Sequence, residues 1–151
     1  MGKCYNVVLD SNYVYVAGAT NSSNQYYVNW DGLMPGKPYK VSFSFITTTE
    51  IAADVALMGV MVNLGCNDTY VYRSNGSMTT SNFLGFLELK DSANFHYYMA
   101  NQTTNPPLYI PSRPFVNQIT VQLTNGIDNT SYYSTPQVNA YILTLHFEEV
   151  D

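Results

Sequence analysis

Short runs in which apolar and polar residues alternate dominate this sequence, and that period of two constrains the fold more than any other feature. The run YKVSFSFIT, from Tyr39 to Thr47, sets valine and phenylalanine against lysine and serine. NQITVQLT and NAYILTLHFEEV alternate in the same way near the end of the chain. Because successive side chains of a strand point to opposite faces, each run predicts a half-buried β-strand.

Further strand candidates are separated by turn residues. They are YNVVLD, YVYVAG, YYVNW, ALMGVMVNLG, TYVYR, FLGFLEL and, more weakly, ANFHYYM. DGLMPGKP carries two glycines and two prolines, while SNGS and TNGID contain the hairpin pair Asn-Gly. Eight to ten short strands at this spacing indicate a sandwich or barrel.

We predict an all-β fold over residues 1–151: a single jelly-roll sandwich of about eight antiparallel strands, in two four-stranded sheets. An immunoglobulin-like sandwich is disfavoured because the Cys…Trp…Cys signature is absent. The long closing strand should be central. TTTEIAADVALMGV, from Thr47 to Val60, is the best helix candidate, although its second half is β-like.

The composition excludes several functional classes. Charged residues make up only 11% of the chain and the net charge is −5, with no basic run, which argues against direct binding to nucleic acid. The sequence contains no stretch of about 18 apolar residues, so it predicts no transmembrane segment. The first residues lack the long apolar core of a signal peptide, so we expect synthesis in the cytosol. A surface of amides, hydroxyls and the phenols of 14 tyrosines suits a protein packed against neighbours, although a free-standing stable β protein has the same composition.

Catalytic and metal-binding motifs are missing, so we predict no enzyme activity, no metal and no cofactor. No two carboxylates are spaced as a pair, and Glu88 reads as a solvated strand residue. His96 and His146 form no cluster, and a lone strand histidine is usually structural. Cys4 and Cys66 are expected to be free and mostly buried thiols rather than a disulfide bridge.

Aromatic residues leave a second function open. Tyrosines and a tryptophan near loops could stack on sugars, so a carbohydrate-binding module is the alternative reading, although tyrosine is also a favoured strand residue. The candidate platforms are Tyr13, Tyr15, Tyr26, Tyr27, Trp30, Tyr97, Tyr98, Tyr132 and Tyr133.

A proline-rich segment, NQTTNPPLYIPSRPFVNQITVQLT from Asn101 to Thr124, is the most distinctive stretch. Prolines fix φ and remove backbone donors, so we expect the stretch with Asn105–Pro107 and Pro111–Pro114, ahead of the strand predicted at NQITVQLT, to run extended over the surface without joining a sheet. Tyr109, Arg113 and Phe115 belong to residue types enriched at interfaces, which makes them the candidate interface residues. The other reading is a stiff crossover between the two sheets.

Three blocks together resemble a known family. They are YYVNWDGLMPGKPYKVSFSFIT, NPPLYIPSRPFVNQITVQLTN and YILTLHFEEV. They are similar to the single-jelly-roll minor capsid proteins of large icosahedral double-stranded DNA viruses. The resemblance implies a structural protein of the virion, made in the host cytoplasm, which lies beneath or between capsomers or forms the vertex. It would bind the major capsid protein and other capsid subunits as part of an oligomeric shell, and it implies no catalytic residues.

Overall fold

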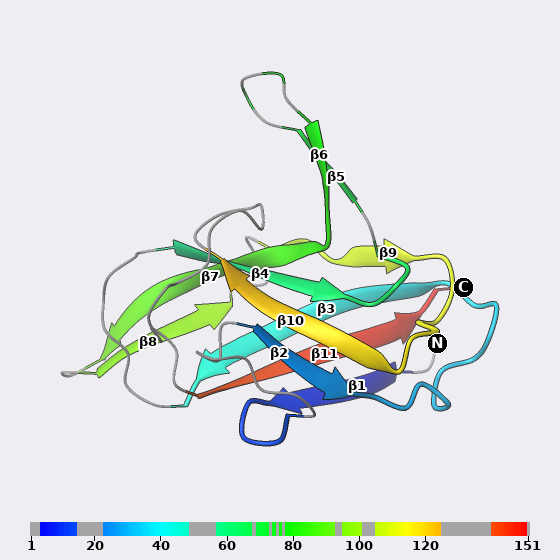
Figure 1. Ribbon diagram of the computed structural model, residues 1–151, viewed down its shortest axis with the longest axis horizontal. Helices are drawn as coiled ribbons and strands as arrows, with labels where there is room; N and C mark the ends of the chain where they lie inside the picture. The colour runs from blue at the N-terminus through cyan, green and yellow to red at the C-terminus, as the bar shows by residue number, and fades with distance from the viewer. Residues whose placement is uncertain are drawn as a thin grey trace.

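A computed structural model describes residues 4–14, 23–48, 57–67, 69–72, 74, 76, 78–92, 95–100, 105–124 and 140–150. Within these residues the chain forms strands and no helix (Figure 1). The strands are β1 (Cys4–Asp10), β2 (Ser23–Tyr27), β3 (Tyr39–Thr47), β4 (Leu57–Asn63), β5 (Thr69–Tyr72), β6 (Met78–Ser81), β7 (Phe83–Ser92), β8 (Phe95–Ala100), β9 (Leu108–Ile110), β10 (Gln118–Thr124) and β11 (Tyr141–Glu149).

Strand pairing follows a nested order. One sheet runs β1-β11-β3-β8-β7-β4-β10-β2, with β9 added to β3, and all its pairs are antiparallel. Setting aside β5, β6 and β9, the first of the eight remaining strands pairs with the last, the second with the seventh, the third with the sixth and the fourth with the fifth. This is a jelly-roll-like sandwich, so the predicted all-β fold is confirmed.

The two layers are joined rather than separate. β7 and β8 pair over the register from Leu87↔Ala100 to Ser92↔Phe95, which connects the layer of β1, β11 and β3 to the layer of β4, β10 and β2. The strands β6 and β9 were not predicted. The strand expected at YYVNW is instead Ser23–Tyr27. Of YVYVAG, only Tyr13 and Val14 are described, and neither lies in a strand. The rest of that run lies outside the described residues, and so does most of the first half of the helix candidate. Its β-like second half is β4.

A hydrophobic core fills the space between the layers. β11 lies between β1 and β3, as predicted for a central strand, and points Tyr141, Leu143, Leu145 and Phe147 inward with no more than traces of exposure. The Trp30 and Phe147 ring centroids are 5.4 Å apart in an edge-on contact. Alternation along each strand thus delivers one apolar face to the core, and burial of such side chains is the main stabilising term.

A small polar network bridges the layers inside this core. The hydroxyls of Tyr26 on β2 and Tyr141 on β11 are 2.9 Å apart, and Asn24 Nδ2 donates to Tyr141 Oη at 3.2 Å. Burial raises the pKa of both tyrosines, and for Tyr26 the neighbouring Tyr141 raises the pKa further. Both hydroxyls therefore stay protonated in the folded protein and act as neutral hydrogen-bonding groups.

Asn105 continues the edge of β7 beyond the point where β8 stops pairing. Its Oδ1 accepts the Phe86 N–H at 2.7 Å and its Nδ2 donates to the Phe86 carbonyl at 2.8 Å, as a paired strand residue would. A Cβ on Gly85 would lie 2.5 Å from Asn105 Oδ1 and 2.7 Å from Phe43, so glycine is needed for this close approach. The buried asparagine thereby closes a gap between the layers.

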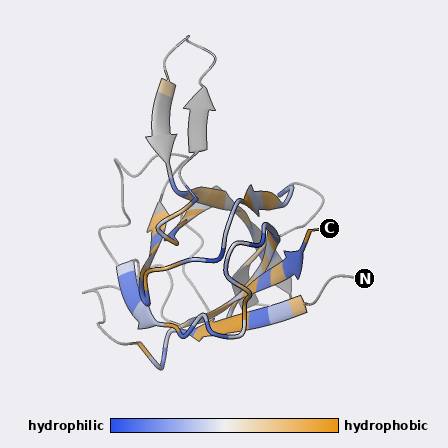
Figure 2. Cartoon of the chain, turned by 90° about the vertical axis from the view of Figure 1, so that its right-hand side faces the viewer, coloured by the Kyte–Doolittle hydropathy of each residue, from blue (hydrophilic) through white to orange (hydrophobic). Residues whose placement is uncertain are grey.

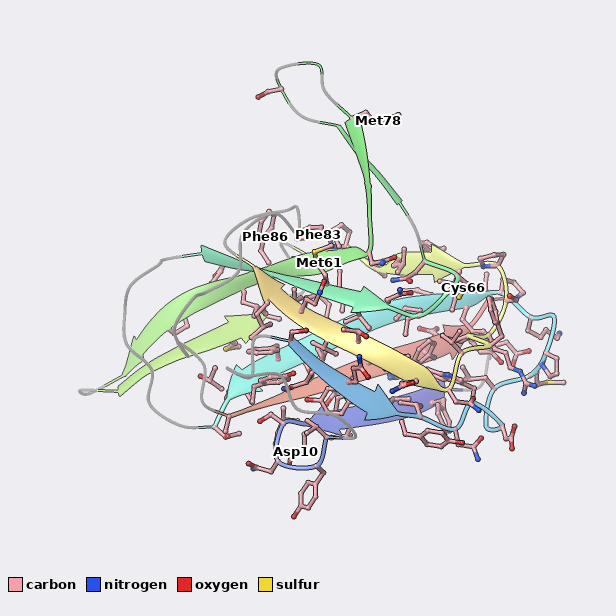
Figure 3. The ribbon with its side chains drawn as sticks, in the orientation of Figure 1. Asp10, Met61, Cys66, Met78, Phe83 and Phe86 are labelled. Atoms are coloured by element: carbon pink, nitrogen blue, oxygen red, sulfur yellow. The ribbon has the colours of Figure 1, made fainter. Side chains whose placement is uncertain are left out.

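A hairpin of β5 and β6 projects away from the sandwich (Figure 1). It forms its own two-stranded sheet and pairs with neither β4 nor β7, between which it is inserted. The SNGS turn predicted a hairpin here, and Gly76 has the positive φ of 88° that such a turn requires. At the base of the hairpin, Met61, Phe83 and Phe86 lie together on the outer side of β4 and β7 (Figure 3).

Candidate protein interface at one end of the sandwich

The proline-rich segment crosses from one layer to the other. Its strand β9 pairs with β3 through Val41↔Leu108, Lys40↔Tyr109 and Tyr39↔Ile110, and its later part, β10, pairs with β4 and β2. The expectation that the segment joins no sheet is therefore wrong. Proline removes donors only at its own position, and the three residues LYI between Pro107 and Pro111 retain enough N–H groups to pair.

Arg113 holds two loops together instead of projecting into solvent. Its Nη1 donates to the Leu33 carbonyl at 2.8 Å and lies 3.5 Å from the Trp30 carbonyl. The side chain is half-buried. The structure thus gives Arg113 a structural contact within the domain, which sequence reasoning did not predict because nothing in the spacing linked it to the loop that follows β2.

Further bonds brace the same end of the sandwich. Trp30 Nε1 donates to the Val116 carbonyl at 2.7 Å, and Val28 N donates to the Asn117 carbonyl at the same length. The loop after β4 joins them, because Cys66 Sγ donates to the Ser112 carbonyl at 3.8 Å. We call residues 28–38, 64–67 and 111–117 the loop end of the sandwich; Cys66 marks its position in Figure 3.

Large apolar side chains are exposed on this braced loop end. Phe115 is 73% exposed and Met34 is 45% exposed. Phe115 is placed beside Gly65, where an added Cβ would lie 3.6 Å from its Cζ. Since a fixed backbone presents these side chains to solvent, they can enter a partner's pocket at a small cost in conformational entropy.

Tyr109 points to a different surface. It is 63% exposed and lies beside Lys40 on the outer face of the layer formed by β1, β11 and β3. The three candidate interface residues therefore occupy three environments: Tyr109 on a sheet face, Arg113 between two loops, and Phe115 on the loop end. The described contacts therefore do not place the three residues in one continuous patch.

The proposed sugar-stacking platforms divide into two groups. Trp30 and Tyr26 are both only 3% exposed and belong to the core, so neither can stack on a sugar. Tyr13 and Tyr27 are 82% and 65% exposed. The remaining platform candidates lie outside the described residues or outside the described side chains; they are Tyr15, Tyr97, Tyr98, Tyr132 and Tyr133.

A polar trough of about 570 Å³ lies on the outer face of β1, β11 and β3. Its charged and basic side chains already have partners within the chain. Lys40 Nζ is 3.8 Å from a Glu148 carboxylate oxygen, and His146 Nδ1 is 2.5 Å from Asn6 Oδ1. We therefore interpret the trough as a solvent-exposed sheet face whose charged and polar side chains interact with one another.

Chemistry-bearing side chains are dispersed in the described part of the chain. No three potential ligands among His, Cys, Asp and Glu converge there. Glu88 is half-buried and pairs with Lys90 at 3.2 Å. Cys4 and Cys66 are free, as predicted, but Cys4 is exposed and Cys66 only half-buried, so the prediction that both are mostly buried is wrong for Cys4. Burial raises the pKa of the Cys66 thiol.

Comparisons with known proteins add no family. The chain matches no model of a protein family, and no curated protein matches it. Among the described residues there is no helix with the length and apolar character needed to cross a membrane.

Proposed function

We propose that this chain is a structural subunit of an icosahedral viral shell, a minor capsid or vertex protein that binds the major capsid protein and other capsid subunits. It would reside in the virion after synthesis in the host cytoplasm. The observation that carries the proposal is the braced loop end with Phe115 exposed by 73%. Interfaces are anchored by such aromatic side chains on a preorganised backbone.

Two further features support a role in assembly. The jelly-roll-like pairing agrees with the fold implied by the family that the sequence resembles, without being specific to it. The projecting β5–β6 hairpin forms its own two-stranded sheet and pairs with no strand of the sandwich. Because an isolated two-stranded hairpin is marginally stable in water, a partner surface would stabilise it.

The proposal is tested by replacing Phe115 with alanine. In particles assembled with the Phe115→Ala chain, we expect incorporation to fall about tenfold or more, because an anchor contributes about 2 kcal/mol. The matched control is Tyr13→Ala, which removes an aromatic side chain that is also largely exposed but lies away from the loop end. Quantitative mass spectrometry of purified particles measures incorporation. If the parent chain is absent from particles and found only free in solution, the proposal is wrong.

The alternative is a carbohydrate-binding module. It is supported by the exposed Tyr13 and Tyr27, which both line a groove of about 330 Å³ between β1 and β2. Binding would then be saturable for the free protein on a glycan array and lost on Tyr13→Ala. The shell subunit should bind no glycan under the same conditions, which separates the two readings.

A further inference from the structure

The edge of β1 is the strongest feature that the proposed shell role does not explain. β1 and β2 are the two ends of the strand order, and a groove of about 330 Å³ runs between them. One wall follows β1 from Tyr5 to Asp10, and the other is formed by Tyr26 to Asn29. β1 lies on the side of the sandwich opposite the projecting hairpin (Figure 1). In Figure 2, β1 runs along the bottom of the sandwich, with its apolar residues in orange.

Hydrogen bonds at the ends of β11 establish which backbone groups of β1 face the groove. Ser11 N donates to the Tyr141 carbonyl at 3.1 Å, in register with the pairing of Leu9 with Leu143. Bonded and unbonded residues alternate in an antiparallel pair, so Tyr5, Val7 and Leu9 bond to β11. The residues that alternate with them are Cys4, Asn6 and Val8, and their backbone N–H and C=O groups point toward the groove.

An independent pair of bonds gives the same assignment. Thr48 N donates to the Ala140 carbonyl and Val150 N donates to the Pro38 carbonyl, so the even-numbered residues of β11 bond to β3. The backbone N–H and C=O groups of the odd-numbered residues of β11 therefore face β1, which agrees with the assignment made from Ser11. In the described part of the chain, the groove-facing groups of Cys4, Asn6 and Val8 have no backbone partner, whereas the Asp10 carbonyl accepts Tyr13 N at 2.9 Å.

This edge also lacks the usual protection against strand pairing. Natural proteins blunt free edges with lysine, proline or a bulge. The sequence CYNVVLD contains neither residue, and the register of β1 with β11 is unbroken. Val8 is 61% exposed on the strand. A row of unpaired groups at strand spacing recognises one kind of ligand, which is another extended backbone.

We propose that β1 pairs antiparallel with β1 of a second copy of this chain, forming a two-fold dimer whose sheet is continuous across both copies. Antiparallel pairing is self-complementary about a two-fold axis, so identical edges satisfy each other. The middle of the strand, Asn6 to Val8, carries no charge, and the one acidic side chain, Asp10, lies at its end (Figure 3). Like charges therefore do not meet at the centre of the contact.

The dimer does not depend on the shell role, and Phe115→Ala should leave it intact. A strand edge alone buries less than the area of a standard interface, so we expect a dissociation constant of about 10 µM to 1 mM. Sedimentation equilibrium of the purified chain over this range measures it. Amide exchange adds a site-specific readout: Asn6 and Val8 should become protected as concentration rises, while Val7 and Leu9, bonded to β11, stay protected throughout.

Three substitutions at Val8 make the test sharp. Val8→Pro removes an N–H group that faces the groove and breaks none of the hydrogen bonds between β1 and β11. Proline is tolerated at such a position of an edge strand. We expect dimerisation to weaken about tenfold or more, because the loss occurs in both copies. Val8→Lys keeps the N–H but places like charges close to one another across the axis, so it should weaken the dimer even if the proline variant fails to fold. Val8→Thr keeps the N–H and the branched shape, and should dimerise like the parent.

Two outcomes would overturn the proposal. The first is a parent chain that remains wholly monomeric at about 1 mM, the upper limit of the expected dissociation constant, where a large part of it should be dimeric. The second is a dimer that persists unchanged in both Val8→Pro and Val8→Lys, which would place the contact elsewhere.

Discussion

At the scale of single residues, Arg113 and Phe115 lie two positions apart and have opposite roles. Arg113 donates to the Leu33 carbonyl at 2.8 Å, whereas Phe115 is mostly exposed to solvent. A hydrogen bond from a charged donor contributes more to stability than a neutral one, and its loss leaves a carbonyl without that donor. The proline-rich segment therefore contains one residue that stabilises the domain and one that is available to a partner.

We predict that Arg113→Ala lowers the free energy of unfolding by about 1–2 kcal/mol, since two carbonyls lose a charged donor. Phe115→Ala should change it by less than about 0.5 kcal/mol, because an exposed side chain is lost. Urea unfolding followed by circular dichroism measures both. Equal effects of the two substitutions would contradict the assignment, and a large effect of Phe115→Ala would show that Phe115 packs into the domain.

At the scale of elements, the β5–β6 hairpin stands apart because its two strands pair only with each other. We predict that replacing residues 69–81 with a short Gly-Ser linker changes the free energy of unfolding by less than about 1 kcal/mol, because the linker still joins β4 to β7 and no strand pairing of the sandwich is removed. Thermal unfolding checks this. A large loss of stability would mean that the hairpin packs on the sandwich, and its suitability as an assembly arm would fail with it.

Periodicity explains which elements could be predicted from the sequence. β3 was located without error and β11 to within two residues, because one face of each strand is buried and the other is partly exposed to solvent. The central place of β11 followed from its length and pattern. The Asn125-Gly126 pair, which predicts a hairpin turn, lies outside the described residues, and the described strands on either side of it, β10 and β11, pair with different strands. A two-residue pattern reports a turn, but it does not report which strands a jelly-roll-like fold brings together.

The candidate site was harder to predict for a related reason. Residue type indicated Trp30 and Tyr26 as possible platforms and Arg113 as a possible anchor, but their roles depend on groups distant in the sequence. Trp30 bonds to Val116, and Tyr26 bonds to Tyr141. Only Tyr109 and Phe115 are exposed as the interface prediction requires.

At the scale of the whole molecule, the hydrogen bond between Tyr26 and Tyr141 connects the two layers. The burial of these two hydroxyls makes the free energy of unfolding depend on pH in the alkaline range. Both tyrosines have a raised pKa in the folded state, so above pH 10, roughly the ordinary tyrosine pKa, the unfolded chain releases protons that the folded chain retains. Rising pH then favours unfolding. The contribution of the two protonated tyrosines to stability is therefore complete below pH 10 and is lost progressively as the pH rises above 10.

We predict that the free energy of unfolding falls above pH 10 by up to about 1.4 kcal/mol per pH unit for each of the two tyrosines, for as long as the pH stays below the folded-state pKa of that tyrosine. The double variant Tyr26→Phe/Tyr141→Phe should lose this steep dependence while costing about 1–2 kcal/mol at pH 7 through lost hydrogen bonds. Urea unfolding at pH 8, 10 and 11 measures the slopes. Parallel slopes for parent and double variant would contradict the assignment.

The nested pairing of first strand with last has a consequence for the order of events during synthesis. β1 emerges from the ribosome early, but its partner β11 follows about 130 residues later, as the pairing of Leu9 with Leu143 shows. Until then both edges of β1 are bare, and contacts of such sequence separation form slowly. The innermost pair, β4 with β7, can close much sooner. Assembly of this fold should therefore proceed outward from the middle of the chain, with the outermost strands exposed for longest.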